Sequence, residues 1–442
     1  MSKDAHQFEH NHKGEPVKRT VKMVVAAVAA ATVGLASIGA VGTGAGAQGS
    51  VRGVTDSEIK VGGLMVASIY GDAQKAAVAR FDLAAKNKEI PGGRKIVSVG
   101  TADDKQTADI DLQEGRRLVD QERVFAVVPV ITPTLQAADY FNQQKVPTVG
   151  WGIASGYCAA TNKYVFGFSG CLVPDPVVYA GNTWGELVSQ QLKAQGKGDA
   201  KGKTAAVVTE DSTSGKSGSE VISATAEAVG MKVVYAKSAL PAPPATVTDY
   251  SPYVQDIMTS NGGQPPDVVF LTLTAQNVIG LGRGLAQAGF KGIQTNAVGY
   301  APQLTQLASG WSAFTQFATP ESTAPEMKNI VSAMNAAGIT QIGQPALAGW
   351  YAADFFVKVL KKAGKNLTPE SFQKAAAKYT YEVPDIVGPT VYPQAFKAST
   401  PCGQLATSNG TSWTVTAPFA CYDLLTKKGS KYVEVPYPSG VK

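Results

Sequence analysis

Strand and helix patterns alternate along most of this chain, and this alternation limits the fold more than any other feature of the sequence. Residues 59–66 have the apolar character of a strand, and residues 73–88 follow with helical spacing. The next strands are predicted at 95–99, 124–130 and 146–149, with helices at 107–122 and 135–144. Because parallel strands joined by helices form a sheet covered on both faces, this part is predicted to be a doubly wound α/β unit.

The alternation stops at residues 150–175, which are rich in Gly, Ser, Pro and Cys, and then starts again. Further helices are predicted at 177–192, 214–228, 250–260, 277–288 and 348–362, and further strands at 204–209, 232–235 and 267–273. Residues 383–442 have the spacing of short strands. A chain of 442 residues exceeds the usual size of one core, so we expect two lobes, each with its own parallel sheet.

The N-terminal region has the pattern of an export signal. Basic residues precede an apolar run from residue 23 to about 41, and Ala45-Gly46-Ala47 matches the small-x-small pattern of a signal-peptidase site. Residues 1–47 are therefore predicted to be a cleaved signal peptide. The alternative is an uncleaved membrane anchor, since the run approaches spanning length. No cysteine lies near the cleavage point to accept a lipid, so we expect an exported protein that is periplasmic, extracellular or associated with the cell surface.

Histidine occurs only at positions 6, 10 and 12, before the apolar run, so the mature chain would contain none. This excludes Ser-His-Asp and Cys-His catalysis and imidazole metal sites, and we expect no enzyme, no metal and no cofactor. The net charge of +6 is small for 442 residues, and no basic stripe is interleaved with aromatic residues. Nucleic acid is therefore not an expected partner.

The four cysteines are Cys158, Cys171, Cys402 and Cys421. An even number in an exported chain indicates two disulfides, for which three pairings are possible. The shortest loops are closed by Cys158–Cys171 and Cys402–Cys421, and we predict this pairing.

Four segments, in this order and spacing, make the chain similar to a known family. They are residues 53–62, residues 92–96 with Asp103-Asp104 downstream, residues 205–208 leading to Gly215 through Gly218, and residues 351–354 with Gly388-Pro389 beyond. The chain resembles the branched-chain amino-acid receptors of the type I periplasmic-binding-protein fold, which serve ABC importers. The resemblance covers nearly the whole mature chain.

The resemblance implies two lobes between which the chain crosses more than once. Lobe 1 would comprise residues 53–172 and 319–385; lobe 2 would comprise residues 173–318 and 386–442, with a C-terminal segment held by a disulfide. The implied protein is a monomer that closes around a small-molecule ligand and delivers it to an ABC permease and its ATPase. The alternatives are a sensor or scavenger without transport, a receptor for amino acids or amides, and a secreted α/β hydrolase, against which the missing histidine argues.

The family's amino-acid site makes a further comparison possible. There, a Ser/Thr-rich turn after the strand at 124–130 holds the ligand carboxylate, and an acid after the strand near 294–298 pairs with the ammonium. This chain has Ile131 and Thr132 in the first turn, and residues 296–300 contain no acid. Because burying an unpaired charge is costly, we predict an apolar or aromatic ligand instead of a free α-amino acid.

The predicted ligand-binding residues all lie at ends of strands or in the turns that follow them, where ligands of open α/β sheets bind. They are Ser68, Tyr70, Ile131, Thr132, Trp151, Gly152, Ser214, Thr274 and Tyr300. Core packing is the alternative role for the three aromatic residues.

Two other motifs have simpler interpretations. Ser214-Gly215-Lys216-Ser217 resembles a phosphate loop, but Glu210 stands where that loop needs a glycine, so a turn between a strand and a helix is predicted. Asp103 and Asp104 are paired carboxylates in sequence, and we interpret them as a solvated turn.

Overall fold

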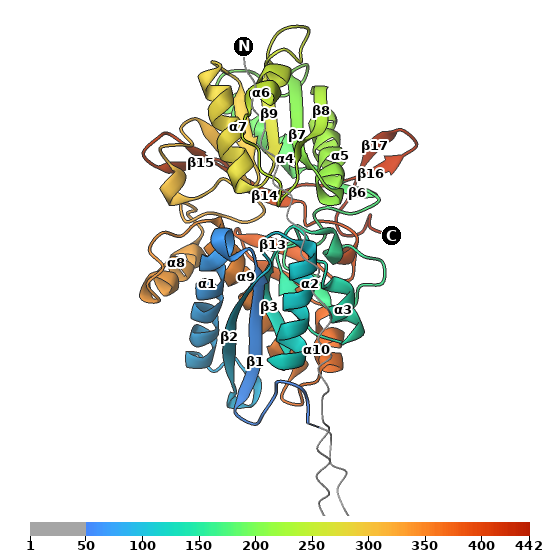
Figure 1. The fold of residues 1–442 in the computed structure, drawn as a ribbon, viewed down its shortest axis with the longest axis vertical. Helices are drawn as coiled ribbons and strands as arrows, with labels where there is room; N and C mark the ends of the chain where they lie inside the picture. Colours follow the sequence, from blue (N-terminus) through green and yellow to red (C-terminus); the bar gives the residue numbers. More distant parts are fainter. Residues whose placement is uncertain (1–49) are drawn as a thin grey trace, which may run out of the picture. The chain divides into compact units, whose positions relative to one another are not determined.

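The computed structural model describes residues 50–442, so the predicted signal peptide lies outside the described residues. These residues fold around two large sheets (Figure 1). One sheet has five parallel strands in the order β2-β1-β3-β4-β5, and the other has seven in the order β15-β14-β11-β10-β9-β7-β8. We call the parts built around them lobe 1 and lobe 2. The predicted α/β fold with two wound sheets is thereby confirmed.

Lobe 1 contains the first five strands of the chain and the helices that cover them. The strands are β1 (Glu58–Met65), β2 (Lys95–Asp103), β3 (Ala126–Ile131), β4 (Thr148–Gly150) and β5 (Val165–Gly167), and the helices are α1 (Ala67–Lys86), α2 (Ala108–Arg116), α3 (Ala138–Gln143), α8 (Pro325–Ala336), α9 (Gln344–Ala363) and α10 (Pro369–Ala376). Alternate residues of a strand point to opposite faces. Met65 therefore packs with α1 and α9, while Leu64 packs with α3 on the other face.

Lobe 2 is built in the same way. Its strands are β7 (Thr204–Asp211), β8 (Lys232–Pro241), β9 (Val268–Thr272), β10 (Ile293–Asn296), β11 (Trp311–Thr315), β14 (Cys402–Ser408) and β15 (Trp413–Cys421), and its helices are α4 (Thr183–Ala194), α5 (Thr213–Ala228), α6 (Ser251–Met258) and α7 (Ala275–Gln287). Val269 and Leu271 of β9 pack with α6 and α7, whereas Val268 and Phe270 pack with α4 and α5. The last two strands, β14 and β15, are antiparallel additions to an otherwise parallel sheet.

The chain passes between the two sheets three times within residues 50–442. It leaves lobe 1 after β5, returns to it after β11 and enters lobe 2 again at β14. Two small sheets lie along these passages. One pairs β12 (Thr380–Val383) with β13 (Val387–Val391), and the other joins β6 (Tyr179–Gly181), β16 (Leu424–Lys428) and β17 (Lys431–Val435). The residue boundaries predicted for the two lobes stay predictions.

Both predicted disulfides are present: Cys158 is bonded to Cys171, and Cys402 to Cys421. The second bond joins residues that lie opposite each other in the β14–β15 pair. No helix within residues 50–442 is both long enough and apolar enough to cross a membrane.

Three local predictions were wrong. The helix predicted at 177–192 begins only at Thr183, because residues 179–181 pair as a strand with β16. The helix predicted at 73–88 begins six residues earlier, at Ala67, where the Asp103 carboxylate accepts a hydrogen bond from the Ala67 amide at 3.1 Å. The turn at Asp103-Asp104 is not solvated: Asp104 is fully buried, and its carboxylate accepts from the Gln106 amide at 2.8 Å.

Candidate functional site

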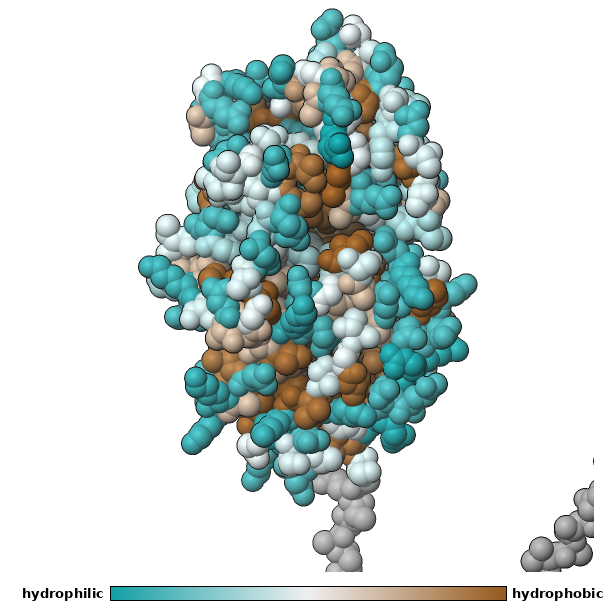
Figure 2. All heavy atoms as spheres, turned by 60° about the vertical axis from the view of Figure 1, so that its left-hand side comes forward, coloured by the Kyte–Doolittle hydropathy of each residue, from teal (hydrophilic) through white to brown (hydrophobic). Residues whose placement is uncertain are grey.

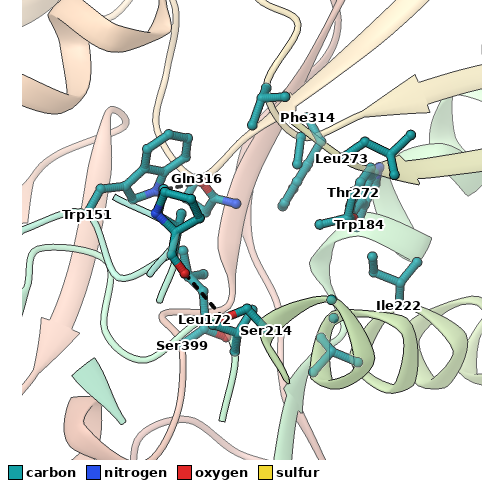
Figure 3. A pocket seen from close by; sticks show the side chains of 18 of the residues that line it. Trp151, Leu172, Trp184, Ser214, Ile222, Thr272, Leu273, Phe314, Gln316 and Ser399 are labelled. Atoms are coloured by element: carbon teal, nitrogen blue, oxygen red, sulfur yellow. Dashed lines mark hydrogen bonds between the residues drawn. The ribbon is translucent and has the colours of Figure 1, made fainter. Parts of the chain in front are cut away.

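A cavity of about 190 Å³ lies where the carboxyl ends of the strands of both lobes meet. Its lining comes from the turns after β1, β3 and β4 in lobe 1, from the ends of β7, β9, β10 and β11 in lobe 2, and from the starts of α4, α5 and β14. Figure 3 shows it from close by, and Figure 2 shows apolar side chains beside a hollow at mid-height. Ligands of open α/β sheets bind outside the carboxyl ends of the strands, so this is the candidate site.

Trp151 forms the part of the wall that follows β4. Its indole nitrogen donates to the Gln316 side-chain oxygen at 3.1 Å, and its ring meets Phe317 edge-on at 5.8 Å. Gln316 follows β11 of lobe 2, so this bond fixes the indole from the opposite lobe. A large aromatic ring held in this way gives a ligand a rigid apolar surface.

The turn after β3 contributes Pro133 to the cavity, but its hydroxyl groups are engaged elsewhere. Thr132 and Thr134 share a hydrogen bond of 2.9 Å between their hydroxyls, and Thr134 donates to Asp111 at 3.4 Å. Asp111 also accepts from the Ala137 amide at 2.8 Å, and burial raises the pKa of Asp111 to about 7. These side chains therefore bond to one another, and none of them lines the cavity.

The cavity continues from Trp151 into lobe 2. Its deep end, which we define as the part bordered by Thr183, Trp184, Ile222, Thr272 and Phe314, belongs largely to the core between the sheet and α4 and α5. Figure 3 shows Trp184, Ile222, Thr272 and Phe314 across the cavity from Trp151 and Gln316. The rings of Trp184 and Phe314 are stacked, with centroids 4.7 Å apart and an angle of 11° between the planes. These two rings therefore give the deep end one flat, apolar side.

Glu210, at the end of β7, is the only charged residue among the described residues that line the cavity. It is 8% exposed and has no basic partner; instead one carboxylate oxygen accepts three hydrogen bonds. These come from the Thr274 amide at 3.0 Å, the Thr274 hydroxyl at 2.7 Å and the Asn277 side-chain amide at 2.6 Å. Hydrogen bonds to the charged form compensate for the burial of a carboxylate.

Tyr70 lies between acids of the two lobes. Burial raises the pKa of Tyr70 far above its usual range, and the charges of Glu210 and Asp104 raise this pKa further. The side chain therefore stays neutral at the edge of the cavity. Since Tyr70 departs from helical geometry within α1, with φ −110° and ψ 15°, the helix start is adjusted locally at this position.

Four of the nine predicted ligand-binding residues line the cavity: Tyr70, Trp151, Ser214 and Thr274. The other five do not line it. Ser68 is exposed on the first turn of α1, while Ile131 and Thr132 are fully buried. Gly152 packs tightly against the carbonyl of Gly170. The roles of all nine in ligand binding stay predictions.

The fifth of these residues, Tyr300, lies away from the cavity. Its hydroxyl donates to Glu321 at 2.9 Å, and its ring packs against Trp413 with centroids 5.3 Å apart. Burial and the neighbouring Glu321 raise the pKa of Tyr300. Its present contacts are those of a packing residue.

Sequence reasoning missed Glu210, Gln316 and the deep end. Glu210 ends a predicted strand, and that position alone was a usable signal because ligands bind at such ends. A second signal was the series of small residues on one face of α5, which leaves room beside the helix. Trp184 and Phe314 had no local signal, because 130 positions of chain separate residues that meet only after folding.

Within residues 50–442, no group of three or more His, Cys, Asp or Glu side chains could hold a metal ion. The lining offers hydroxyl, amide and aromatic groups. Such a set can bind and orient an organic molecule by burial and hydrogen bonding.

Two sheets whose strands end at a shared cavity, with repeated passages between them, define a two-lobed binding protein. The profile of the periplasmic binding protein family matches residues 58–411, and the chain belongs to this family. No curated protein sequence matches it.

Solved structures agree on the fold. A possible leucine/isoleucine/valine-binding protein from Rhodopirellula baltica SH 1 is 16% identical, with a TM-score of 0.64 over 83% of this chain and 98% of that one. A fatty acid ABC transporter substrate-binding protein from Thermomonospora curvata is 17% identical, with a TM-score of 0.64 over 85% and 95%. A solute-binding protein from Rhodopseudomonas palustris HaA2, in complex with p-hydroxybenzoic acid, is 18% identical, with a TM-score of 0.65 over 83% and 97%.

Proposed function

We propose that this protein is an exported solute receptor that captures a small organic molecule between its two lobes and delivers it to an ABC importer. The ligand is apolar or aromatic and is not a free α-amino acid. Binding draws the lobes together, because a ligand that contacts both of them favours the closed arrangement. A membrane permease with its ATPase then receives the ligand.

One observation carries the proposal: the cavity is bordered by both lobes, and its lining is apolar and aromatic with a few placed polar groups. Trp151 from lobe 1 and Gln316 from lobe 2 are joined by a hydrogen bond at this cavity. Pockets that bind small molecules have this composition. The structural neighbours, whose names refer to branched-chain amino acids, a fatty acid and an aromatic acid, support a solute-binding role of this kind.

A free amino acid needs acceptors for its ammonium and donors for its carboxylate. Glu210 is the specific observation that favours the alternative of an amino-acid receptor, since it is an acid in the lining. One of its two carboxylate oxygens, Oε1, is however already occupied by Thr274 and Asn277. The Thr132 hydroxyl, predicted to face a ligand, is bonded to Thr134 instead.

The decisive experiment is a thermal-shift screen of the purified mature protein against amino acids, aromatic acids and neutral apolar solutes, followed by calorimetry of each hit. A ligand that binds only the folded state raises the melting temperature. We expect neutral apolar or aromatic solutes to raise it and aliphatic amino acids to leave it unchanged. Sub-micromolar binding of leucine, isoleucine or valine would establish an amino-acid receptor, and turnover of ester substrates would establish a hydrolase.

Delivery to an importer needs a separate test. Uptake of the best radiolabelled ligand should be lost in cells that lack this protein and restored when it is supplied. Unchanged uptake, with intact binding in vitro, would favour a sensor or scavenger.

A further inference from the structure

We infer that the ligand is an elongated, uncharged molecule whose apolar body lies along α5 inside lobe 2 and whose neutral polar end lies beside Trp151 and Gln316. The inference rests on the proposed function, because it specifies the ligand class for the same cavity. It departs from an amino-acid, fatty-acid or aromatic-acid ligand, each of which carries a carboxylate.

The length of the ligand follows from the side of the cavity that α5 forms. Six residues on one face of this helix line the cavity, and we call them the α5 stripe: Ser214, Gly215, Gly218, Val221, Ile222 and Thr225. At the rise of an α-helix, the distance from Ser214 to Thr225 is about 16 Å. A cavity that follows three turns of a helix is longer than a free aliphatic amino acid.

Gly218 keeps this passage open. A Cβ atom at this position would meet only the Thr272 methyl group, at the ordinary contact distance of 3.7 Å, so no packing requires a glycine here. Gly215 differs, because a Cβ atom there would overlap the backbone carbonyl of Glu210. A larger side chain at position 218 would therefore fit the fold and project into the cavity between its two ends.

The charge of the ligand follows from the helix starts around the cavity. A helix N-terminus attracts anions through its unpaired amides. At each of these starts a side chain of this protein already accepts a hydrogen bond from one amide. Asp103 accepts from Ala67 in α1, Ser212 accepts from Gly215 in α5 at 2.9 Å, Thr225 accepts from Gly185 in α4 at 3.0 Å, and Glu210 accepts from Thr274 before α7.

No lysine or arginine is among the described residues of the lining, and the one charged residue is the acid Glu210. A bound carboxylate would be desolvated without a counter-ion and would be repelled by Glu210. A neutral amide or hydroxyl avoids both costs and can still bond to Gln316 or to Gln106, whose side-chain oxygen is buried without a partner.

The deep end adds a further requirement. Thr183 is 3% exposed, lines the cavity, and its hydroxyl has no hydrogen-bond partner; the Thr272 hydroxyl is likewise without one. Buried polar groups are normally paired, so a ligand that fills this end and carries an oxygen there would satisfy a group that the protein leaves open. The body of the ligand therefore ends in a neutral oxygen function.

The test compares matched probes by calorimetry: primary amides from butanamide to dodecanamide, the corresponding carboxylic acids, and ω-hydroxydodecanamide. We expect each added methylene to raise the affinity for amides by about fourfold until the deep end is filled. Each acid should bind about tenfold or more weakly than its amide, and the ω-hydroxy amide should bind more tightly than dodecanamide.

Variants then locate the probe. Gly218→Leu should lower the affinity for dodecanamide about tenfold or more while the affinity for butanamide changes little. Glu227→Leu, on the exposed side of the same helix, is the control and should change neither. Glu210→Gln keeps an acceptor for Thr274 and removes the charge. It should therefore reduce the difference in affinity between each acid and its amide. Gly218→Ala provides a milder change if Gly218→Leu does not fold.

The inference would be overturned by equal affinity for short and long amides or by tighter binding of the acids. It would also be overturned if the folded Gly218 variants bound short and long amides as the wild type does. A failure of the wild-type protein to bind either series would overturn it as well. The proposed function is judged separately by the broader solute screen, in which amino acids and aromatic acids are present, so binding there with no binding here would refute only the inference.

Discussion

The turn after β3 and the deep end border the same cavity, but their hydroxyl groups have opposite surroundings. In the turn, Thr132 and Thr134 bond to each other and to Asp111, and nothing in this network faces the cavity. At the deep end, the hydroxyls of Thr183 and Thr272 are buried without partners. A group that is already paired contributes stability and shape, whereas an unpaired buried group can be satisfied by a ligand. Under the proposed function, polar recognition would therefore lie partly in lobe 2, away from the predicted threonine turn.

The largest expected effect concerns stability and pH in the turn network. Burial raises the pKa of Asp111 to about 7. Between the ordinary pKa of an aspartate and about pH 7, Asp111 is therefore protonated in the folded state and ionised in the unfolded chain. The free energy of unfolding should therefore fall as pH rises through this window, by up to about 4 kcal/mol from this group. Urea unfolding at about pH 5 and about pH 8 samples the upper part of this window, where a fall of roughly 2–3 kcal/mol is expected.

Asp111→Asn supplies the control for this slope, because the amide oxygen can still accept from Ala137. The variant should lose much of the pH dependence. A residual slope of the same sign is expected from Asp104, whose pKa burial also raises. If wild type and variant show the same slope, Asp111 is not the proton carrier.

The next effect concerns Trp151, which lines the cavity that the turn after β3 and the deep end both border. Trp151→Ala removes the indole that packs on Phe317 and bonds to Gln316, and it should cost roughly 2 kcal/mol or more of binding free energy, the loss expected for a buried aromatic anchor. Trp151→Phe keeps the ring and loses the hydrogen bond, so its cost should be smaller. Calorimetry with the best ligand from the screen measures both, and unchanged affinity in Trp151→Ala would place the site elsewhere.

Two glycines of the α5 stripe give a matched pair of smaller effects on stability. Gly218→Ala adds a methyl group at an ordinary distance from Thr272 and improves helix propensity, so it should stabilise the protein by up to about 1 kcal/mol. Gly215→Ala forces a methyl group onto the Glu210 carbonyl and should destabilise it by about 1–3 kcal/mol. Denaturant unfolding of both variants measures the two changes in the free energy of unfolding. If both substitutions stabilised or both destabilised the protein, the difference between the two glycines would be wrong.

Much of the fold could be predicted from the sequence, because the strands and helices of a wound α/β lobe are periodic in their own residues. The strand at 59–66 and the helix at 214–228 were predicted within a residue or two of β1 and α5. The strand β6 was missed because it pairs with β16, about 240 positions later, and residues 177–192 show only helical spacing. The solvated Asp103-Asp104 turn was wrong for a similar reason, since burial of Asp104 depends on neighbours distant in the chain.

The candidate site was predictable where it follows a strand end and not where it lies inside a lobe. Trp151 and Ser214 each lie within a few residues after a predicted strand, and both line the cavity. Tyr300 follows a strand as well, yet its contacts with Glu321 and Trp413 hold it away. The deep end is formed by side chains of α4, α5, β9 and β11 that only the folded lobe brings together, so no local pattern could reveal it.

Removing one hydroxyl from the turn after β3 and one from the deep end tests the difference between the two regions. Thr132→Val loses the bond to Thr134, so it should destabilise the protein by about 1 kcal/mol and leave ligand affinity unchanged, because Thr132 does not line the cavity. Thr183→Val removes a hydroxyl that has no partner, so its effect on stability should be near zero. The binding of ω-hydroxydodecanamide to Thr183→Val should be weaker by about 1 kcal/mol, and the binding of dodecanamide should not change. Unfolding measurements and calorimetry on both variants separate the roles. A loss of stability in Thr183→Val with no change in probe selectivity would show that this hydroxyl serves the fold, and the contrast between the two regions would then disappear.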